Sequence, residues 1–291
     1  MALSFKHKFF NISVSAFETL LKSISVDSYH KAVAEIMERL DTKVEVKTSA
    51  GPIYLTCTSE TARIRAQNML TREPDTLRWI EGFKPDEVLW DLGCNVGVFS
   101  LYAAIVAKSR VVSFDPLPFN YMEIFKNIVA NGLSARVQPF CVAITDQTTI
   151  ANLYLPLEAV TPGGAGGTFG QKQDGYGDEV QAVVEHSTLG YSVDDFVSKF
   201  NVPFPNHLKM DIDGPTDPVI RGAVNTLRDP RLRSAMLELQ PTKVPANKIA
   251  WDTTMKEMEI AGFKLVKTVA TTPDGGGNPV NDATNNFFIK E

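Results

Sequence analysis

The spacing of apolar residues changes near residue 85, and this change divides the chain into two parts. In the first part, apolar residues recur at helical intervals and predict one amphipathic helix: Tyr29, Val33, Ile36, Met37 and Leu40. Short apolar runs at 44–46 and 53–57 flank a Gly-Pro turn and predict two strands, and a helix is expected over 75–82. We therefore expect residues 1–80 to form an N-terminal cap of helices and short strands, and residues 81–291 to form the main domain.

From residue 87 onward, short apolar runs alternate with segments of helical periodicity. The expected strands cover residues 87–91, 111–114, 136–144, 208–211, 235–239, 263–268 and 286–290. The expected helices cover residues 98–107, 119–131, 219–227 and 247–261, and the second of them has an apolar face: Tyr121, Ile124, Phe125, Ile128 and Val129. This alternation predicts an α/β fold with a parallel sheet covered on both faces. The turn-rich residues 273–279 join the last two strands and indicate an antiparallel edge.

A glycine-rich segment interrupts this rhythm between the third and fourth expected strands. Residues 161–177 contain seven glycines. Such a segment is either a flexible surface linker or a mobile loop over an active site, because long irregular loops in compact domains are usually functional or disordered. The sequence leaves both interpretations open.

Composition and charge narrow the class of protein. Of 291 residues, 44% are hydrophobic and 22% are charged, which is typical of a globular protein with a core and excludes global disorder. Lys and Arg number 29 against 34 Asp and Glu, and the net charge of -5 disfavours a nucleic-acid partner.

The cysteines and the apolar runs bear on location. Cys57, Cys94 and Cys141 lie far apart and form no C-x-x-C pair, so neither a zinc site nor a disulfide framework is indicated. A reducing, cytoplasmic setting is expected. Polar residues interrupt the apolar run that follows Phe9-Phe10, and no run reaches the roughly 18 apolar residues of a membrane helix, so neither targeting nor membrane insertion is expected.

The most informative segment is a strand that ends in an acid and leads through a glycine-rich turn into a helix. Asp91 precedes the turn, and the glycines follow the pattern Gly93-x-x-x-Gly97. A dinucleotide site requires G-x-G-x-x-G, so that a pyrophosphate can lie on the helix N-terminus. This spacing argues against an NAD-dependent oxidoreductase, and Asp91 would repel a phosphate but suit a cationic amine.

A second acid follows the next strand. Asp115 lies 24 residues after Asp91, close to the interval at which an acid accepts hydrogen bonds from a ribose diol. The site therefore suits a nucleoside and an amine and lacks a phosphate cradle. S-adenosylmethionine meets all three conditions, and we expect it as the cofactor.

The motifs also resemble those of a known family. The first motif of class I methyltransferases is similar to the segment DLGCNVGVFS. From about Arg72 to the C-terminus, the chain also resembles the FkbM family. Four further segments carry this resemblance: FDPLPFNYMEIFKNIVANGL, STLGYSVDDF, LKMDIDGPTDPVIRGAVNTL and LELQP. The resemblance implies a Rossmann-like sheet of seven strands and O-methylation, typically of sugar or polyketide hydroxyls. The acid-proline pair Glu73-Pro74 is similar to one that precedes the first strand in this family.

The residues and the resemblance together assign a cofactor site. Asn120 matches an asparagine of the family pattern, and Ala143, at the end of the third expected strand, is expected near the adenine. The expected cofactor-binding residues are Glu73, Asp91, Gly93, Cys94, Asn95, Gly97, Asp115, Pro116, Asn120 and Ala143.

The substrate end of the site departs from the family pattern. Where the family reads D-x-E-G-x-E, this chain has Asp211 and Asp213, and Thr216 replaces the second Glu. These two acids and Glu238 end adjacent strands and are the expected catalytic residues, because a sugar hydroxyl requires a general base or a metal to become nucleophilic. The three carboxylates would bind Mg²⁺ or position substrate hydroxyls directly. Among the histidines only His186 is a candidate base, and a structural role is its alternative.

These observations predict an S-adenosylmethionine-dependent O-methyltransferase that acts on a small hydroxylated substrate, expected to be a sugar. Methylation of another nucleophile, such as an amide, a phenol or an RNA base, is one alternative. A non-catalytic scaffold that binds S-adenosylmethionine is the other, and the replacement by Thr216 is its only support.

Overall fold

The computed structural model describes residues 2–40, 43–175, 177–271 and 282–290. Contacts divide the chain into two compact units, Met1–Thr42 and Lys43–Glu291. The boundary near residue 80 that we expect from the sequence stays a prediction. The turn-rich segment expected at 273–279 lies outside the described residues.

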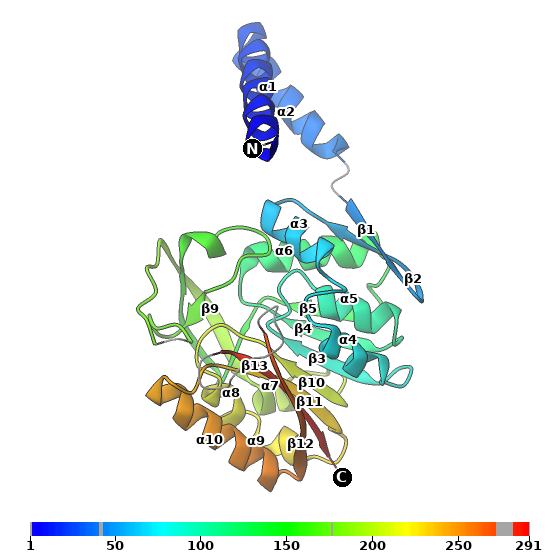
Figure 1. Cartoon of the computed structure of the whole chain (residues 1–291), viewed down its shortest axis with the longest axis vertical. Helices are drawn as coiled ribbons and strands as arrows, with labels where there is room; N and C mark the ends of the chain where they lie inside the picture. The colour runs from blue at the N-terminus through cyan, green and yellow to red at the C-terminus, as the bar shows by residue number, and fades with distance from the viewer. Residues whose placement is uncertain (1, 41–42, 176, 272–281, 291) are drawn as a thin grey trace. The chain divides into compact units, whose positions relative to one another are not determined.

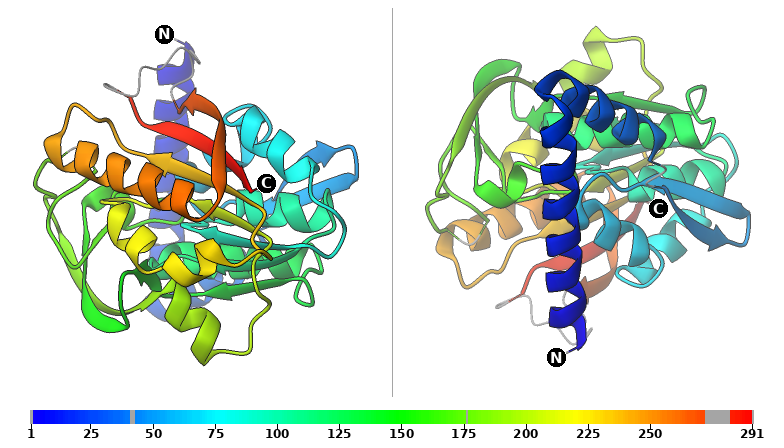
Figure 2. Two further views of the ribbon diagram at one scale, coloured as in Figure 1. Left: turned by 90° about the horizontal axis from the view of Figure 1, so that it is seen from below. Right: turned by 90° about the horizontal axis from the view of Figure 1, so that it is seen from above.

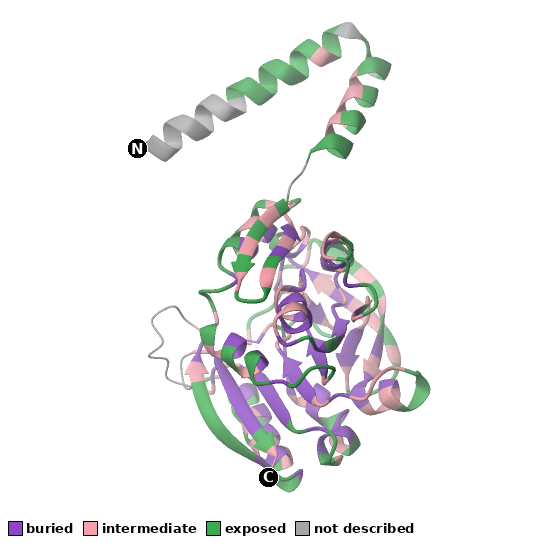
Figure 3. Cartoon of the chain, turned by 90° about the vertical axis from the view of Figure 1, so that its right-hand side faces the viewer, coloured by how far each residue is buried: buried purple, intermediate pink, exposed green. Residues whose placement is uncertain are grey.

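The N-terminal unit consists of two helices, α1 (Ala2–Ile24) and α2 (Val26–Arg39). The helix predicted from Tyr29 to Leu40 is confirmed as α2, which Ser25 caps by accepting a hydrogen bond from the Ser28 backbone N–H at 3.0 Å. Much of the described part of both helices is exposed (Figure 3). The exposed residues include apolar ones, namely Ile12, Val14, Phe17, Leu20 and Met37. Among the described helices, none combines the length and the apolar character that a bilayer span requires.

The larger unit is built on a seven-stranded sheet with the order β12-β13-β11-β10-β3-β4-β5 (Figure 1). Its strands are β3 (Val88–Leu92), β4 (Arg110–Phe114), β5 (Val137–Phe140), β10 (His207–Met210), β11 (Ser234–Leu239), β12 (Phe263–Ala270) and β13 (Thr284–Lys290). All neighbouring pairs from β11 to β5 are parallel, whereas β13 is antiparallel to both β11 and β12. The expected Rossmann-like sheet with an antiparallel edge is confirmed.

Apolar side chains on both faces of the sheet explain why its strands are buried. Along β3, Val88, Trp90 and Leu92 join one hydrophobic core, and Leu89 joins the other. One face is covered by α4 (Pro74–Glu81), α5 (Val98–Ile105) and α6 (Pro118–Ala130). The opposite face is covered by α8 (Asp217–Arg221), α9 (Val224–Arg228) and α10 (Pro245–Ile260), as the views in Figures 1 and 2 show.

The predicted strand pair is confirmed as an antiparallel hairpin, β1 (Lys43–Thr48) and β2 (Gly51–Thr56), which leads into α3 (Glu60–Gln67). Asparagines of α6 and its C-terminus hold this hairpin. The backbone N–H of Tyr54 donates to Asn131 at 2.9 Å, and that of Thr56 donates to Asn127 at 2.6 Å. The hairpin and α3 thereby extend the layer of α4, α5 and α6.

The face of α6 that is buried differs from the predicted one. Ile124 and Ile128 are buried as expected, but Phe125 and Val129 are 50% and 62% exposed. Polar residues take their place on the buried face, namely Asn120, Glu123 and Asn127. These side chains bind the loops and the hairpin that pack on α6, so hydrogen bonding decides which face is buried.

The single strand predicted over 136–144 is wrong, because the chain leaves the large sheet after β5. The following residues form β6 (Ala143–Thr145), which pairs with β9 (Val184–Ser192) instead of β4. With β7 (Thr149–Leu155) and β8 (Thr168–Phe169) they form a second sheet of order β6-β9-β7-β8. A short 3₁₀ helix, η1 (Leu157–Ala159), follows β7, and α7 (Val193–Lys199) follows β9.

The single helix predicted over 219–227 is also wrong, since it is divided into α8 and α9 at Gly222. A Cβ at Gly222 would lie 2.4 Å from the carbonyl oxygen of Thr145, so only glycine permits this approach of the helix to β6. The second piece has its own cap, because Asp194 accepts hydrogen bonds from the backbone N–H groups of Asn225 and Thr226, both at 2.8 Å.

Candidate active site

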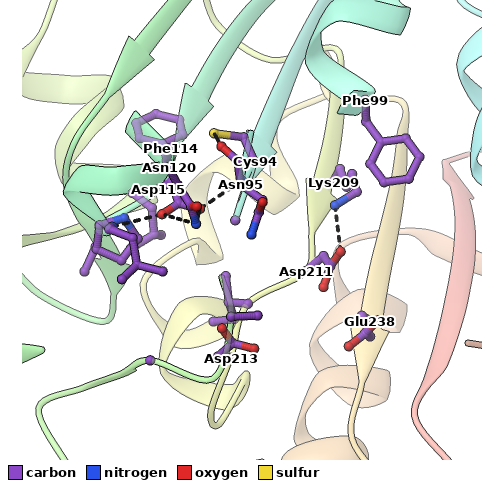
Figure 4. Close-up of a pocket in the computed structure, with 18 of the residues that line it drawn as sticks. Cys94, Asn95, Phe99, Phe114, Asp115, Asn120, Lys209, Asp211, Asp213 and Glu238 are labelled. Atoms are coloured by element: carbon purple, nitrogen blue, oxygen red, sulfur yellow. Dashed lines mark hydrogen bonds and ion pairs between the residues drawn. The ribbon is translucent and has the colours of Figure 1, made fainter. Parts of the chain in front are cut away.

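A pocket of about 370 Å³ lies at the carboxyl ends of β3, β4, β10 and β11 (Figure 4). In an open α/β sheet, ligands bind at this edge. Eleven residues that the sequence predicts for the site line it: Glu73, Gly93, Cys94, Asn95, Asp115, Pro116, Asn120, Ala143, Asp211, Asp213 and Glu238. Asp91, Gly97 and His186 do not belong to its wall. His186 lies on β9, opposite Leu153 of β7.

The turn between β3 and α5 passes directly against the end of β10. Gly93 has a left-handed backbone (φ +80°), and a Cβ there would lie 1.8 Å from the Asp211 carbonyl oxygen. Every other residue is therefore excluded at this position. Asn95 is also left-handed, with φ 51°, and its backbone N–H donates to Asp115 at 2.8 Å. The turn thus presents backbone atoms to the pocket and ties two strand ends together.

Asp115 is buried and accepts several hydrogen bonds. The backbone N–H groups of Asn95 and Leu117 donate to its two oxygens at 2.8 Å and 2.9 Å. The Asn120 amide lies 3.3 Å from one oxygen. Burial raises the pKa of Asp115 to about 7, although these hydrogen bonds favour the ionised form. A carboxylate has about four lone-pair sites, and these three donors leave about one of them for a ligand hydroxyl group.

Asp91 lies behind the pocket and not in its wall. Its side chain is fully buried and accepts a hydrogen bond from the Ser100 hydroxyl at 2.6 Å. Its other oxygen lies 3.6 Å from the ammonium of Lys209. The closest cation in the described part of the chain is therefore a lysine, and the expected contact between Asp91 and a ligand amine stays a prediction.

Lys209 is a pocket residue that the sequence analysis missed. It lies on β10, is 1% exposed, and contacts Asp211 through an ion pair of 3.1 Å. Its ammonium also lies 4.9 Å from the centre of the Phe99 ring (Figure 4). Burial alone would lower the pKa of Lys209, but the negative charges of Asp211, Asp91 and Glu73 outweigh it and raise this pKa. A lysine between Leu208 and Met210 inside a buried strand is the signal that could have identified it, because buried lysines are almost always paired.

The three expected catalytic acids differ in their surroundings. Asp213 lines the pocket and accepts a hydrogen bond from the Gly166 N–H at 2.6 Å, and desolvation by the surrounding protein raises its pKa to about 6. Asp211 is held by Lys209. The Glu238 carboxylate has no hydrogen bond or ion pair with any described residue, and burial together with the charges of Asp211 and Glu73 raises its pKa well above the usual range.

Glu73 is a further acid of the pocket wall. It accepts hydrogen bonds from the Thr76 hydroxyl at 3.0 Å and from the Asn285 amide at 2.9 Å. Burial and the charge of Asp211 raise the pKa of Glu73. Several acids with raised pKa values in one pocket are typical of an active site.

The acids do not form a magnesium site. Within the described ranges, no three His, Cys, Asp or Glu side chains are arranged to hold a metal ion. The Lys209 ammonium already neutralises the Asp211 carboxylate, which a magnesium ion would otherwise use as a ligand. The donor set therefore does not fit Mg²⁺, and the magnesium interpretation is not supported.

The glycine-rich segment forms part of the pocket wall. Gly164, Ala165 and Gly167 line the pocket. Four side chains from three parts of the fold hold residues 162–164. Ser59 donates to the Pro162 carbonyl at 2.5 Å, and Arg65 donates to the Gly163 carbonyl at 2.6 Å. Asn95 donates to the Gly164 carbonyl at 2.8 Å, and Asn120 accepts from the Gly163 N–H at 2.9 Å. These contacts favour the interpretation as an active-site loop over that of a surface linker.

A family model and a curated relative match most of this chain. The model of the methyltransferase FkbM domain matches residues 91–265. The hexuronic acid methyltransferase AglP of Haloferax volcanii is 24% identical over 207 residues, which cover 67% of this chain and 79% of AglP.

Solved structures are similar at low identity. P. horikoshii TYW2 in complex with MeSAdo is 12% identical with a TM-score of 0.42, and the match covers 90% of this chain and 83% of that one. M. jannaschii TYW2 in complex with AdoMet is 12% identical with a TM-score of 0.40, and the match covers 87% and 88% of the two chains.

Proposed function

Because the chain belongs to the FkbM methyltransferase family and is an S-adenosylmethionine-dependent methyltransferase, we propose that it methylates a hydroxyl group of a small sugar. The observation that carries this proposal is one pocket in which a glycine turn and Asp115 meet the carboxylates of Asp211, Asp213 and Glu238. The hexuronic acid methyltransferase of H. volcanii supports a sugar as the acceptor.

The residues at the cofactor end fit S-adenosylmethionine. The turn at Gly93 lines the pocket with backbone atoms, and Asp115 offers an acceptor for a ribose hydroxyl. Apolar residues around Ala143 suit an adenine ring: Phe114, Leu117, Val142, Ile144 and Leu153. Glu73 is the acid in the pocket wall that would face the amino group. When bound, the cofactor supplies a methyl group activated by a positively charged sulfur.

The acceptor end would orient a hydroxyl and remove its proton. Asp211, which Lys209 fixes, accepts a hydrogen bond from the substrate and aligns it. Glu238, which has no partner among the described residues and has a raised pKa, would accept the proton that the substrate hydroxyl loses on methylation. His186 has no part in this mechanism, because it lies outside the pocket wall.

Thr216 gives little support to a non-catalytic scaffold. Its side chain is buried, and it does not belong to the pocket wall. The pocket wall of this chain nevertheless contains three acids that could take part in proton transfer, Asp211, Asp213 and Glu238.

Turnover on a substrate panel tests the proposal. The enzyme is incubated with S-adenosylmethionine and neutral sugars, uronic acids, a phenol, an amide or a tRNA transcript, and S-adenosylhomocysteine is quantified. We expect product only with hydroxylated sugars, with a mass gain of one methyl group. Methylation of the RNA or the amide alone would overturn the proposed acceptor, and cofactor binding without any turnover would favour a scaffold.

Asp115→Asn is expected to weaken binding of S-adenosylhomocysteine by about 10- to 100-fold, because charged hydrogen bonds to the ribose are lost. Calorimetry measures this affinity. Asp86→Asn is the matched control, because Asp86 is an exposed acid that precedes β3 and lies outside the pocket. Equal affinities of the two variants would contradict the ribose assignment.

The same titrations give a pH dependence. The ionised form of Asp115 is the better acceptor, and its pKa is about 7 in the free protein. Affinity should therefore rise as the pH rises through about 7 and should level off above it. The Asp115→Asn variant should lose this rise, whereas the Asp86→Asn variant should keep it.

A further inference from the structure

Two arginines line the pocket beside the proposed cofactor and acceptor sites. Arg65 lies on α3, and Arg72 lies in the segment that joins α3 to α4. Arg65 donates through its Nε to the Gly163 carbonyl at 2.6 Å. No ion pair links either guanidinium to an acid of the described chain, and the Arg72 side chain also has no hydrogen bond there. Their terminal nitrogens are therefore available to a ligand.

Arg65 carries its charge in the pocket among charges of both signs. Burial lowers the pKa of Arg65 and the like charge of Arg72 lowers it further, whereas the charges of Asp211, Asp213 and Asp115 raise it. Neighbouring acids do not relieve the repulsion between the arginines by direct contact, because Lys209 already pairs with Asp211, and Asp213 bonds to the Gly166 N–H. An anionic ligand group between the arginines would relieve the repulsion.

We propose that Arg65 and Arg72 form a carboxylate-binding subsite of this pocket. Guanidinium groups bind carboxylates through paired, charge-assisted hydrogen bonds. A carboxylate fits better than a phosphate, because acids that include Glu73 and Asp213 share the pocket and would repel a dianion more strongly. The carboxylate belongs either to the amino-acid end of the cofactor or to an acidic sugar acceptor, and the second source rests on the proposed function.

Arg72→Gln tests the subsite without disturbing the Gly163 contact of Arg65. Calorimetry compares S-adenosylhomocysteine with methylthioadenosine, which has the same thioether nucleoside but no amino acid. If the cofactor supplies the carboxylate, binding of S-adenosylhomocysteine weakens about tenfold or more and that of methylthioadenosine is unchanged. Arg63→Gln is the control, because Arg63 lies on α3 like Arg65, pairs with Glu60 and does not line the pocket.

A second arm tests the acceptor as the source. Turnover is measured with methyl glucuronide and methyl glucoside, which differ in one carboxylate. If the acceptor supplies the carboxylate, the wild-type enzyme prefers the glucuronide. Arg72→Gln then raises the KM for the glucuronide about tenfold and changes the KM for the glucoside little.

The subsite is overturned if Arg72→Gln matches the Arg63→Gln control in both arms, or if it weakens both nucleosides equally. The proposed function fails in a different way, because wild type would then convert neither glycoside whatever the cofactor titrations show. Arg65→Lys provides a second check. It keeps the charge, so it should retain more ligand affinity than Arg65→Gln if the subsite exists.

Discussion

Replacing Glu238 by glutamine should lower kcat by about 10²- to 10⁴-fold and leave the affinity for S-adenosylhomocysteine near that of wild type, since a positioned general base contributes about this much. Glutamine keeps the size of the side chain but cannot accept the hydroxyl proton. Glu238 is the acid best suited to this role, because its carboxylate has no partner among the described residues, whereas Asp211 and Asp213 are engaged by Lys209 and Gly166.

The pH profile of wild-type kcat provides an independent check of this role. A base acts only when ionised, so the rate should fall as the pH falls through the pKa of Glu238. Because this pKa is raised well above the usual range, the decline should begin at a higher pH than for an ordinary glutamate. Glu259→Gln, an exposed change on α10, is the matched control. Full activity of Glu238→Gln would exclude Glu238 as the base.

The cofactor end could be predicted from the sequence because its geometry is local. Each parallel strand of the sheet ends at the same edge, so Gly93, Asn95 and Asp115 must converge once the strands are recognised. The two-sided burial of β3 is likewise visible in the alternation of Leu89, Trp90 and Leu92 between two cores.

The rest of the fold depends on contacts between distant residues. The chain at Ala143 leaves the large sheet because it pairs with Gly190 of β9, and no local pattern encodes that partner. On α6, the exposure of Phe125 and the burial of Asn127 reverse the order that hydrophobicity predicts, because Asn127 bonds to Thr56 of the hairpin. Apolar periodicity alone could not indicate this face.

The cationic residues of the pocket were missed for the same reason. Arg65 belongs to α3, whose sequence is mostly polar and lies in the segment expected to be a cap. Its role depends on packing against Gly163, which is 98 residues away in the sequence. Lys209 is different, because a lysine within an apolar strand already implies a buried acidic partner, which is found in Asp91 and Asp211.

Lys209→Met is expected to reduce the free energy of unfolding by about 3–5 kcal/mol, the typical cost of removing one partner from a buried ion pair. Methionine fills similar space but leaves Asp91, which is fully buried, without its only cation in the described chain. Urea denaturation monitored by circular dichroism measures the change. Lys256→Met, an exposed substitution on α10, should change stability by no more than about 0.5 kcal/mol.

A double variant separates the loss of charge pairing from the loss of packing. If unpaired carboxylates cause the instability, Lys209→Met combined with Asp211→Asn should be more stable than Lys209→Met alone, because one uncompensated charge is removed. If lost packing causes it, the second substitution should give no recovery. Wild-type stability of Lys209→Met would show that the acids at these strand ends do not require the lysine, and its proposed role in fixing Asp211 would then be lost.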